Sequence, residues 1–248
     1  MEKIFMTKNE FKYIMEVISK ADRRDYLPIL KGICFKANEV VALDSYRLCI
    51  RKLNTTLKGE YIINYADIKQ VSKISNRNIK YVEINFYEDK AIIKLLSDAS
   101  TVINKFTYEL MKGSFVNYSS LISNRSNDKI IINEGKKLAD TIKGLRKNQT
   151  IAIEYIDNNL SVYKADYSTD NNRWELCLID IIETSTKANK SVLIGFNASY
   201  LREAIKYYDD IVIRYINSTC QVSFESMIDE KKFDLVLPVR LVGVMKKI

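Results

Sequence analysis

The sequence contains no histidine among its 248 residues. This absence excludes Ser-His and Cys-His nucleophile pairs, histidine acid–base catalysis and nearly every zinc site except one built from four cysteines. The four cysteines stand far apart with no C-x-x-C pair, which favours buried free thiols over a metal site or disulfides. With only seven glycines, the chain also lacks a glycine-rich phosphate loop. We therefore expect no metal and no cofactor, while carboxylate or lysine chemistry stays open.

Long apolar runs are missing as well. No uninterrupted run approaches the ~18 residues that cross a bilayer, and the N-terminus lacks the apolar core of a signal peptide. We expect a cytoplasmic protein. The content of 47% hydrophobic and 28% charged residues is ordinary for a folded chain with room for one large domain or two smaller ones. The formal net charge of +8 suggests either a polyanionic partner or simply a basic surface.

What the sequence does contain is a pattern that occurs four times. A short apolar strand leads to a Thr or Asn suited to cap a helix, and a helix with one apolar stripe follows. The strand and helix ranges are 3–7 with 8–19, 60–64 with 65–74, 129–133 with 134–145, and 192–197 with 198–208. A hairpin and one further strand follow each helix, the last of these strands spanning 233–241. The expected caps are Thr7, Asn64, Asn133 and Asn197, at intervals of 57, 69 and 64 residues.

The pattern predicts an α+β chain of four β-α-β-β-β units. Two units per domain give domains at 1–122 and 123–248, with the boundary in the polar run at 122–128.

Each predicted helix also carries basic residues on the side away from its apolar stripe. For one helix taken alone, a solvated face explains them. Four such helices together favour a basic surface that faces a polyanion, although acidic residues between the lysines and arginines lower its positive charge. The residues are Lys8, Lys12, Lys69, Lys73, Arg77, Lys136, Lys143, Lys147, Arg202 and Lys206.

Several motifs, in chain order, resemble those of the bacterial-type DNA polymerase sliding clamp, the DNA polymerase III β-subunit family. Leu43-Asp44-Ser45-Tyr46-Arg47-Leu48, which by itself is an ordinary corner between two strands, resembles the family pattern T-D-G-H-R-L. Residues 112–118 resemble G-x-F-P-D-Y, residues 196–201 resemble F-N-x-x-Y-L, and residues 235–241 resemble the terminal M-P-x-R-L.

The resemblance covers the second and third domains of the family and implies the DNA clamp fold, with helices lining a ring and sheets outside. Family rings contain six domains, so a two-domain chain implies a homotrimer joined head to tail. A monomer, an open chain or association with another clamp subunit stays open. The implied partners are double-stranded DNA, bound without sequence preference, and DNA polymerase and clamp-loader subunits. DNA contacts would include Arg23 and Arg24, and no catalytic residue is required.

The resemblance also implies a pocket that takes linear peptide motifs of these partners. Its residues would be Leu30, Leu43, Ser45, Tyr46, Arg47, Leu48, Val116, Leu121, Asn197, Tyr200, Leu235, Leu237, Pro238, Val239 and Arg240. Leu43, Ser45, Tyr46 and Val116 depart from the family residues, so the preferred peptide would differ. Residues 242–248 run past the family's usual end and could cover the pocket, extend it or be disordered.

Two other functions compete with a sliding clamp. One is a clamp-like adaptor or decoy that binds replication proteins without encircling DNA. The other is a nuclease that uses the carboxylate pairs Asp209-Asp210 or Glu88-Asp89, although turn residues of this kind are usually solvated.

Overall fold

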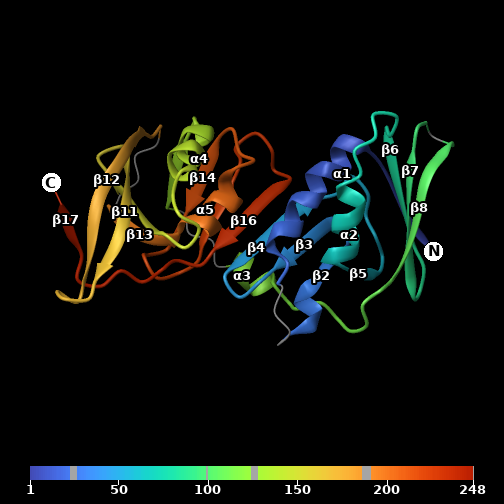
Figure 1. The fold of residues 1–248 in the computed structure, drawn as a ribbon, viewed down its shortest axis with the longest axis horizontal. Coiled ribbons are helices and arrows are strands. Elements are labelled where there is room, and N and C mark those ends of the chain that lie inside the picture. The colour runs from blue at the N-terminus through green and yellow to red at the C-terminus, as the bar shows by residue number, and fades with distance from the viewer. Residues whose placement is uncertain (23–26, 99, 124–127, 186–190, 248) are drawn as a thin grey trace. The chain divides into compact units, whose positions relative to one another are not determined.

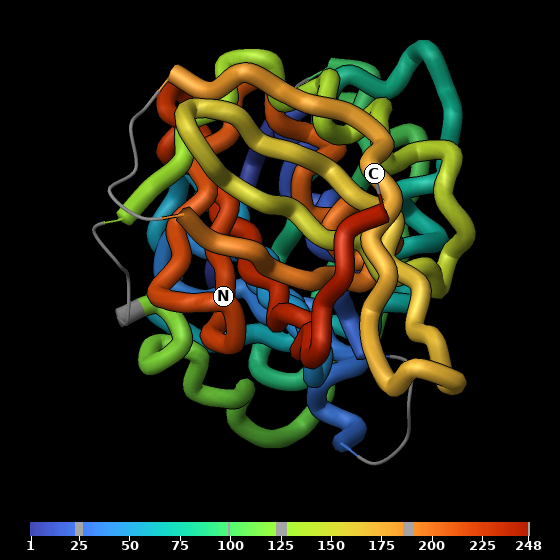
Figure 2. The backbone as a smooth tube through the Cα atoms, turned by 90° about the vertical axis from the view of Figure 1, so that its left-hand side faces the viewer, coloured from blue at the N-terminus to red at the C-terminus, as the bar shows by residue number. Residues whose placement is uncertain are grey.

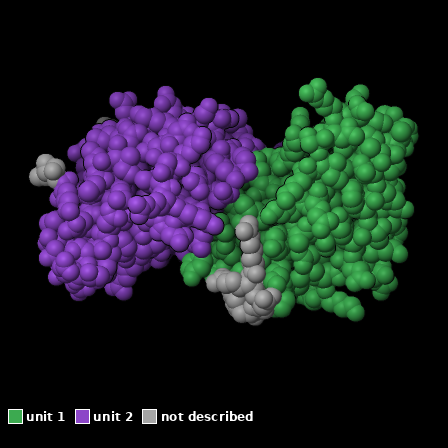
Figure 3. Space-filling model, viewed as in Figure 1, with its two compact units in different colours: residues 1–117 green, residues 118–248 purple. Residues whose placement is uncertain are grey.

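The computed structural model describes residues 1–248 except 23–26, 99, 124–127, 186–190 and 248. The chain divides into two compact units, Met1–Asn117 (unit 1) and Tyr118–Ile248 (unit 2), shown in Figure 3. The division falls between Asn117 and Tyr118, whereas the sequence placed the domain boundary between residues 122 and 123. Across the described residues, no helix is long and apolar enough to span a membrane.

Unit 1 contains two copies of the predicted β-α-β-β-β order (Figure 1). The first copy consists of β1 (Glu2–Thr7), α1 (Lys8–Ile14), its 3₁₀ continuation η1 (Met15–Lys20), the short 3₁₀ turn η2 (Pro28–Lys31), β2 (Gly32–Lys36), β3 (Glu39–Leu43) and β4 (Arg47–Lys52). The second copy consists of β5 (Glu60–Asn64), α2 (Tyr65–Ser72), β6 (Tyr81–Phe86), β7 (Lys90–Leu96) and β8 (Val102–Glu109).

Unit 2 repeats the same order after a short helix, α3 (Ser119–Ser123). Its first copy consists of β9 (Lys129–Ile132), α4 (Gly135–Lys143), β10 (Thr150–Ile156), β11 (Asn159–Ser168) and β12 (Arg173–Glu183). Its second copy consists of β13 (Val192–Asn197), α5 (Ala198–Ile205), β14 (Ile211–Arg214), β15 (Val222–Glu225) and β16 (Lys232–Val236). A final strand, β17 (Met245–Lys247), was not predicted. The α+β class and the four-fold repeat are confirmed.

The two copies in each unit exchange their first strands. In unit 1, β1 pairs antiparallel with β6 of the second copy, and β5 pairs with β2 of the first. The two sheets of this unit therefore run β1-β6-β7-β8 and β5-β2-β3-β4. Unit 2 does the same: β13 pairs with β10, and β9 pairs with β14. Each sheet contains strands from both copies, so neither copy can complete its sheet without the other.

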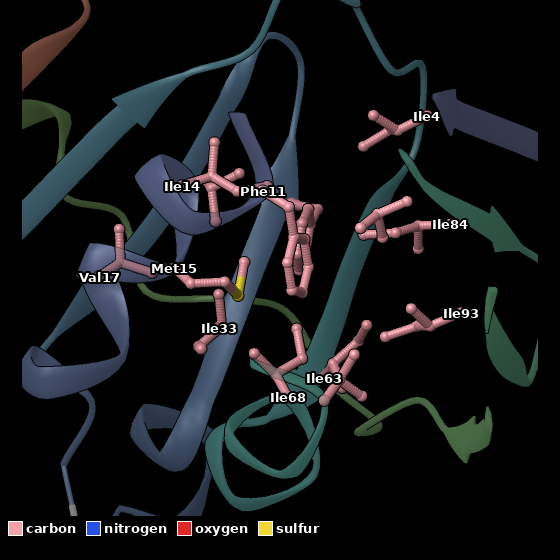
Figure 4. Close-up of a cluster of buried hydrophobic side chains, with 14 of the residues drawn as sticks. Ile4, Phe11, Ile14, Met15, Val17, Ile33, Ile63, Ile68, Ile84 and Ile93 are labelled. Carbon is pink, nitrogen blue, oxygen red and sulfur yellow. The ribbon is translucent and has the colours of Figure 1, made fainter. Parts of the chain in front are cut away.

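One apolar core joins both sheets and the helices of unit 1. The predicted helix stripe is buried at Phe11, Ile14 and Met15, and these side chains face strand isoleucines from both sheets, among them Ile33, Ile63, Ile84 and Ile93 (Figure 4). Burying one such side chain contributes roughly 1.5–3 kcal/mol. Unit 2 has a corresponding core, in which α4 and α5 bury Leu138, Ile142, Leu201 and Ile205.

Three of the four predicted helix caps are confirmed. The side chains of Thr7, Asn64 and Asn197 each accept a hydrogen bond from a backbone N–H in the first turn of the following helix. The prediction for Asn133 is wrong, since the N-cap of α4 is Glu134 and no side chain caps it. Here the Gly135 N–H donates instead to the Asp209 carbonyl at 2.7 Å, so this helix start is held by neighbouring backbone.

Several elements end earlier than predicted. The helix α2 ends at Ser72 and α4 ends at Lys143, so Arg77 and Lys147 lie in turns rather than on helix faces. The strand predicted over 233–241 ends at Val236. Pro238 follows two residues later and has no N–H to donate to a ladder, which accounts for the end of β16.

The four cysteines are free thiols. Cys34 and Cys49 are buried as predicted, and burial raises the pKa of the Cys34 thiol to about 12. The prediction of burial is wrong for Cys177, which is exposed on β12, and Cys220 is half-buried.

Candidate functional site

The corner between β3 and β4 is held by Asp44. Its Oδ1 atom accepts hydrogen bonds from the Tyr46 and Arg47 amides at 2.8 Å each. Its Oδ2 atom forms an ion pair with the Arg47 guanidinium, with Nη2 at 2.6 Å and Nε at 3.1 Å. The same Nη2 also donates to the Ser19 carbonyl at 3.3 Å. Arg47 thus ties the corner to η1, and its role in the free chain is structural.

The predicted pocket residues of unit 1 differ in exposure. Tyr46 projects from the corner with 45% of its surface exposed, whereas Leu48 is 1% exposed. Leu30 and Leu43 are buried as well. Ser45 is exposed and Val116 is half-buried. A ligand approaching this unit would therefore meet the Tyr46 ring rather than the leucines.

The segment that carries Val116 is anchored by Glu60. One oxygen of Glu60 accepts from the Phe115 amide at 2.7 Å, and the other accepts from Lys36 at 2.8 Å. Burial raises the pKa of Glu60, but these two hydrogen bonds outweigh it and hold the pKa below its ordinary value. The carboxylate form therefore holds the backbone next to Val116 in place.

The predicted pocket residues of unit 2 include two with structural roles. Asn197 caps α5 and accepts from the Ser199 and Tyr200 amides. Leu235 lies in β16 and is buried. By contrast, Leu237 is 38% exposed, and Leu121 on α3 is similarly exposed. Tyr200, Pro238 and Val239 are half-buried, and Arg240 is exposed.

After β16 the chain crosses closely over β13. The Val239 N–H donates to the Gly195 carbonyl at 2.8 Å, and these residues form an isolated antiparallel bridge. A Cβ atom at Gly195 would lie 2.5 Å from the Val239 oxygen, a distance that side-chain carbons do not adopt. Gly195 is therefore required for the path of residues 237–241, which the glycine count alone could not indicate.

A cavity of about 860 Å³ lies within unit 2, beside this crossing. It is lined by β13, by the turn at 215–219 and by residues 239–243. Val239 and Arg240 are the only members of the predicted peptide pocket among its lining residues.

The candidate DNA-contacting residues are mostly exposed. Lys12, Lys73, Arg77, Lys136, Lys143, Lys147 and Lys206 are exposed, and Lys8, Lys69 and Arg202 are half-buried. Arg23 and Arg24 lie outside the described residues.

Among the described residues, Lys8, Arg202 and Lys206 of this set have partners within the chain. The Lys8 Nζ atom donates to the Asn76 carbonyl at 2.7 Å, and Lys206 forms an ion pair with Glu203 at 2.6 Å. Arg202 donates to the Lys143 carbonyl at 3.3 Å, which links α5 to the end of α4. The Glu203 carboxylate offsets the positive charge of Lys206, whereas the two carbonyl acceptors orient Lys8 and Arg202 and leave their charges in place.

The carboxylate pairs proposed for nuclease chemistry have other surroundings. Asp210 is buried and accepts hydrogen bonds from the Ser226 hydroxyl and the Met227 amide, which fixes the loop after β15. Glu88 and Asp89 lie exposed in the turn between β6 and β7. Within the described part of the chain, no group of three or more Cys, Asp or Glu side chains could hold a metal ion.

Both units have the fold of the bacterial DNA polymerase sliding clamps. The sliding clamp of Bacillus subtilis matches with a TM-score of 0.79 and 21% identity over 97% of this chain and 65% of that one. A putative DNA polymerase III beta subunit from Eubacterium rectale matches with a TM-score of 0.80 and 18% identity, covering 97% and 66% of the two chains. The beta subunit from Streptococcus pyogenes matches with a TM-score of 0.75 and 19% identity over the same shares.

The chain thus spans about two thirds of the length of the clamps it matches. No protein-family model and no curated protein matches it by sequence.

Proposed function

We propose that this chain is a DNA sliding clamp, a polymerase processivity factor that encircles duplex DNA and tethers its partners through a peptide-binding pocket. The observation that carries the proposal is a match to the clamp fold over 97% of the chain. A clamp stays on DNA because its ring surrounds the duplex, and it works by holding its partners there. This function therefore requires no catalytic residue.

The exposed lysines on and beside the helices support DNA binding. Lys73 and Lys143 are exposed at the ends of α2 and α4, and the half-buried Lys69 lies on α2. In the proposed clamp these lysines attract phosphates without reading sequence. Such attraction is sensitive to salt and leaves the protein able to slide.

A six-domain ring would take three copies of a chain with two clamp units. The copies would join head to tail through unlike surfaces. The ring closes when each joint turns the next copy by one third of a full rotation without a shift along the axis. The expected mass is three times 28.8 kDa.

The exposed apolar side chains of Tyr46, Leu121 and Leu237 support a peptide pocket, since each offers apolar surface to a ligand. Polymerase and clamp-loader subunits would be the partners that carry the peptides.

A clamp-like adaptor that binds replication proteins without encircling DNA is the second candidate. It is favoured by the ion pair between Lys206 and Glu203, because this contact lowers the positive charge that α5 offers to DNA.

Retention on closed circular DNA separates the two functions. We expect the loaded protein to stay on a nicked circle, to leave when the circle is linearised, and to form a trimer by light scattering. The triple variant Lys69→Glu, Lys73→Glu, Lys143→Glu should leave DNA at lower salt than the wild type, because three phosphate attractions become repulsions. The matched control is Lys112→Glu, an exposed position in a loop after β8.

A protein that is never retained on circular DNA, yet binds a partner peptide, would instead establish the adaptor.

A further inference from the structure

The sheet β1-β6-β7-β8 of unit 1 has an outer face, on the side away from the helices of this unit. Successive residues of a strand point to opposite faces of a sheet, and Ile4, Ile84 and Ile93 point into the core that they share with α1. Their neighbours along the strands therefore point outwards. The register of the four strands brings these residues together on the outer face: Lys3 and Phe5 of β1, Tyr81 and Glu83 of β6, Lys94 of β7 and Lys105 of β8.

Unit 2 contains the equivalent sheet, β13-β10-β11-β12. In this sheet Glu154 of β10 lies opposite Leu193 of β13, just as Glu83 of β6 lies opposite Phe5 of β1 in unit 1. Both glutamates are buried although they belong to outer faces. The outer faces of the two sheets can therefore be compared position by position.

The end of the chain crosses the outer face in unit 2. Leu241 packs on a small apolar cluster of that face, which includes Ala152 and Leu176. Lys246 of β17 then forms an ion pair with Glu154 at 2.7 Å. Figure 2 shows this red segment beside the yellow and orange strands. The outer face of unit 2 is thus covered by an extended segment that supplies an apolar side chain and a cation.

In unit 1 the same face is open. The cations beside Glu83 come from the sheet itself, with Lys3 at 2.6 Å and Lys94 at 2.7 Å. Phe5 remains 41% exposed, and Lys105 is exposed and forms no ion pair with another described residue. The face that unit 2 covers with its own chain is therefore accessible to a ligand in unit 1.

The open face presents positive charge to the solvent. The Glu83 side chain is 9% exposed, whereas the side chains of Lys3 and Lys94 are 49% and 32% exposed. The carboxylate thus lies beneath its two cations, and Lys105, the register partner of Lys94, adds a third cation. Charge complementarity favours a polyanion at this face.

The same face has an exposed aromatic pair. The rings of Phe5 and Tyr81 are stacked, with their centroids 5.3 Å apart and an interplanar angle of 23°. The Lys3 ammonium lies 5.8 Å from the centre of the Phe5 ring. Aromatic side chains on the open face of a sheet, with lysines around them, form a surface on which nucleobases stack while the cations attract phosphates.

We propose that the outer face of the sheet β1-β6-β7-β8, which we call the platform, binds single-stranded nucleic acid. Bases stack on Phe5 and Tyr81, and phosphates lie against Lys3, Lys94 and Lys105. The platform lies on the side of the sheet opposite α1 and α2. The inference therefore goes beyond the duplex binding of the proposed clamp and depends on different residues.

Stacking is tested by fluorescence anisotropy with labelled oligothymidylate and oligouridylate of about 12 nucleotides, a usual site size. Phe5→Leu keeps an apolar side chain but removes the ring, so we expect the dissociation constant to rise at least about fivefold. Tyr81→Leu should weaken binding in the same way. The matched control is Tyr167→Leu, which should bind as the wild type does, because Tyr167 is 48% exposed on β11 of unit 2 and lies outside the platform. The oligonucleotide that binds more tightly identifies DNA or RNA as the source of the ligand.

The phosphate contacts are tested by salt dependence. Lys105→Gln removes one contact without breaking an ion pair, so the slope of log K against log[salt] should become shallower by about 0.7. Lys112→Gln is the control, since it makes the same charge change at an exposed position in the loop after β8 and should keep the wild-type slope. Phe5→Leu should weaken binding without changing the slope, because it removes no charge.

An acidic peptide is the competing ligand for a positive and partly apolar face. If the wild type binds oligoglutamate more tightly than either oligonucleotide, and Phe5→Leu keeps that binding, the platform is a peptide site and the proposal is wrong. The proposal is also overturned if Phe5→Leu and Tyr81→Leu bind oligonucleotides as the wild type does. Circular dichroism on heating checks that the variants are folded.

Retention on circular DNA is a separate measurement, so the platform and the ring can fail independently. A protein that stays on circles but binds neither oligonucleotide overturns the platform and leaves the proposed clamp in place. A protein that binds oligonucleotides through Phe5 but never stays on circles supports the platform and overturns the ring.

Discussion

At the scale of single residues, the Asp44 carboxylate lies in a motif that suggests ligand recognition, but it is bonded to groups of its own corner. Both carboxylate oxygens are used, one by two amides of the corner and the other by Arg47. The side chains of the pair are 9% and 11% exposed, so the ion pair is largely shielded from water. The corner is consequently rigid before any ligand arrives, and Tyr46 is the side chain that it presents.

Replacing Asp44 tests this role. Asp44→Ala leaves a mostly buried guanidinium without its carboxylate and two amides without their acceptor, and we expect a loss of about 3 kcal/mol in the free energy of unfolding. Urea denaturation measures it. Lys36→Ala, which breaks the more exposed pair with Glu60, should cost less than about 1 kcal/mol. Equal losses of unfolding free energy in the two variants would contradict the conclusion that Asp44 stabilises the corner more than an exposed ion pair does.

Glu83 gives unit 1 a dependence on pH. Burial raises its pKa, but hydrogen bonds from Lys3, Lys94 and Asn85 outweigh burial and lower the pKa to about 2. The folded state therefore favours the carboxylate more than the unfolded state does, and this stability is fully present above pH 4.5.

As the pH falls from about 4.5 towards 2, that contribution should be lost. The measurement is urea unfolding at a series of pH values for the wild type and Glu83→Gln. The variant should be less stable at neutral pH and show a shallower loss in acid. Parallel curves for the two proteins would exclude Glu83 as the source.

At the scale of elements, residues 237–241 can cross closely over β13 only because Gly195 has no side chain. Gly195 lets the Val239 carbonyl and the Leu241 side chain approach a strand that would otherwise present a Cβ atom. Residues 237–241 include Leu237 and Pro238 of the predicted pocket. The position of these two residues therefore depends on Gly195, which is not itself a predicted pocket residue.

Gly195→Ala should displace this segment. The added Cβ would lie 2.5 Å from backbone, which cannot yield as a flexible side chain can, and we expect a destabilisation of about 1–3 kcal/mol. Faster hydrogen exchange at the Val239 amide would report the displaced segment directly. Gly144→Ala is the control, because nothing lies within 4 Å of its Cβ position and its φ of −77° suits any residue. Unchanged exchange at Val239 in Gly195→Ala would contradict this account.

At the scale of the whole molecule, exchange of first strands between repeat copies makes each unit a single cooperative body. The residues of the peptide pocket that we propose come from both units, so its test uses the full chain.

The double variant Tyr46→Ala, Leu237→Ala removes exposed apolar surface from each unit without emptying either core. We expect binding of a partner peptide, measured by fluorescence anisotropy, to fall at least about tenfold, which a loss of 1.4 kcal/mol accounts for. Light scattering should show the same assembly as the wild type. Undiminished binding in the double variant would place the peptide site elsewhere on the chain.

Much of the fold could be predicted because its signals are local. The stripes at Phe11, Ile14 and Met15 and the caps at Thr7, Asn64 and Asn197 each depend on neighbours within a few residues. The Asn133 prediction failed because the backbone of a distant loop, at Asp209, already satisfies the start of that helix. Arg77 and Lys147 were misplaced because helix ends follow from tertiary packing more than from periodicity.

The candidate site was predictable only in part for the same reason. Sequence motifs identified the Asp44 corner, but they could not show that Leu30, Leu48 and Leu235 are buried while Tyr46 and Leu237 are exposed. Nor could they show that Met245–Lys247, near the end of the chain, pair with β12.

The sequence by itself determined the order of the elements, their four-fold repetition and the clamp-like motifs, because hydrophobic period and capping chemistry act over short stretches of chain. Only the tertiary structure decided which copy each first strand joins, why Gly195 must be glycine and where residues 245–247 lie. Those outcomes depend on pairing between strands far apart in the chain, where backbone register and close approach determine the result and leave no periodic trace in the residues themselves.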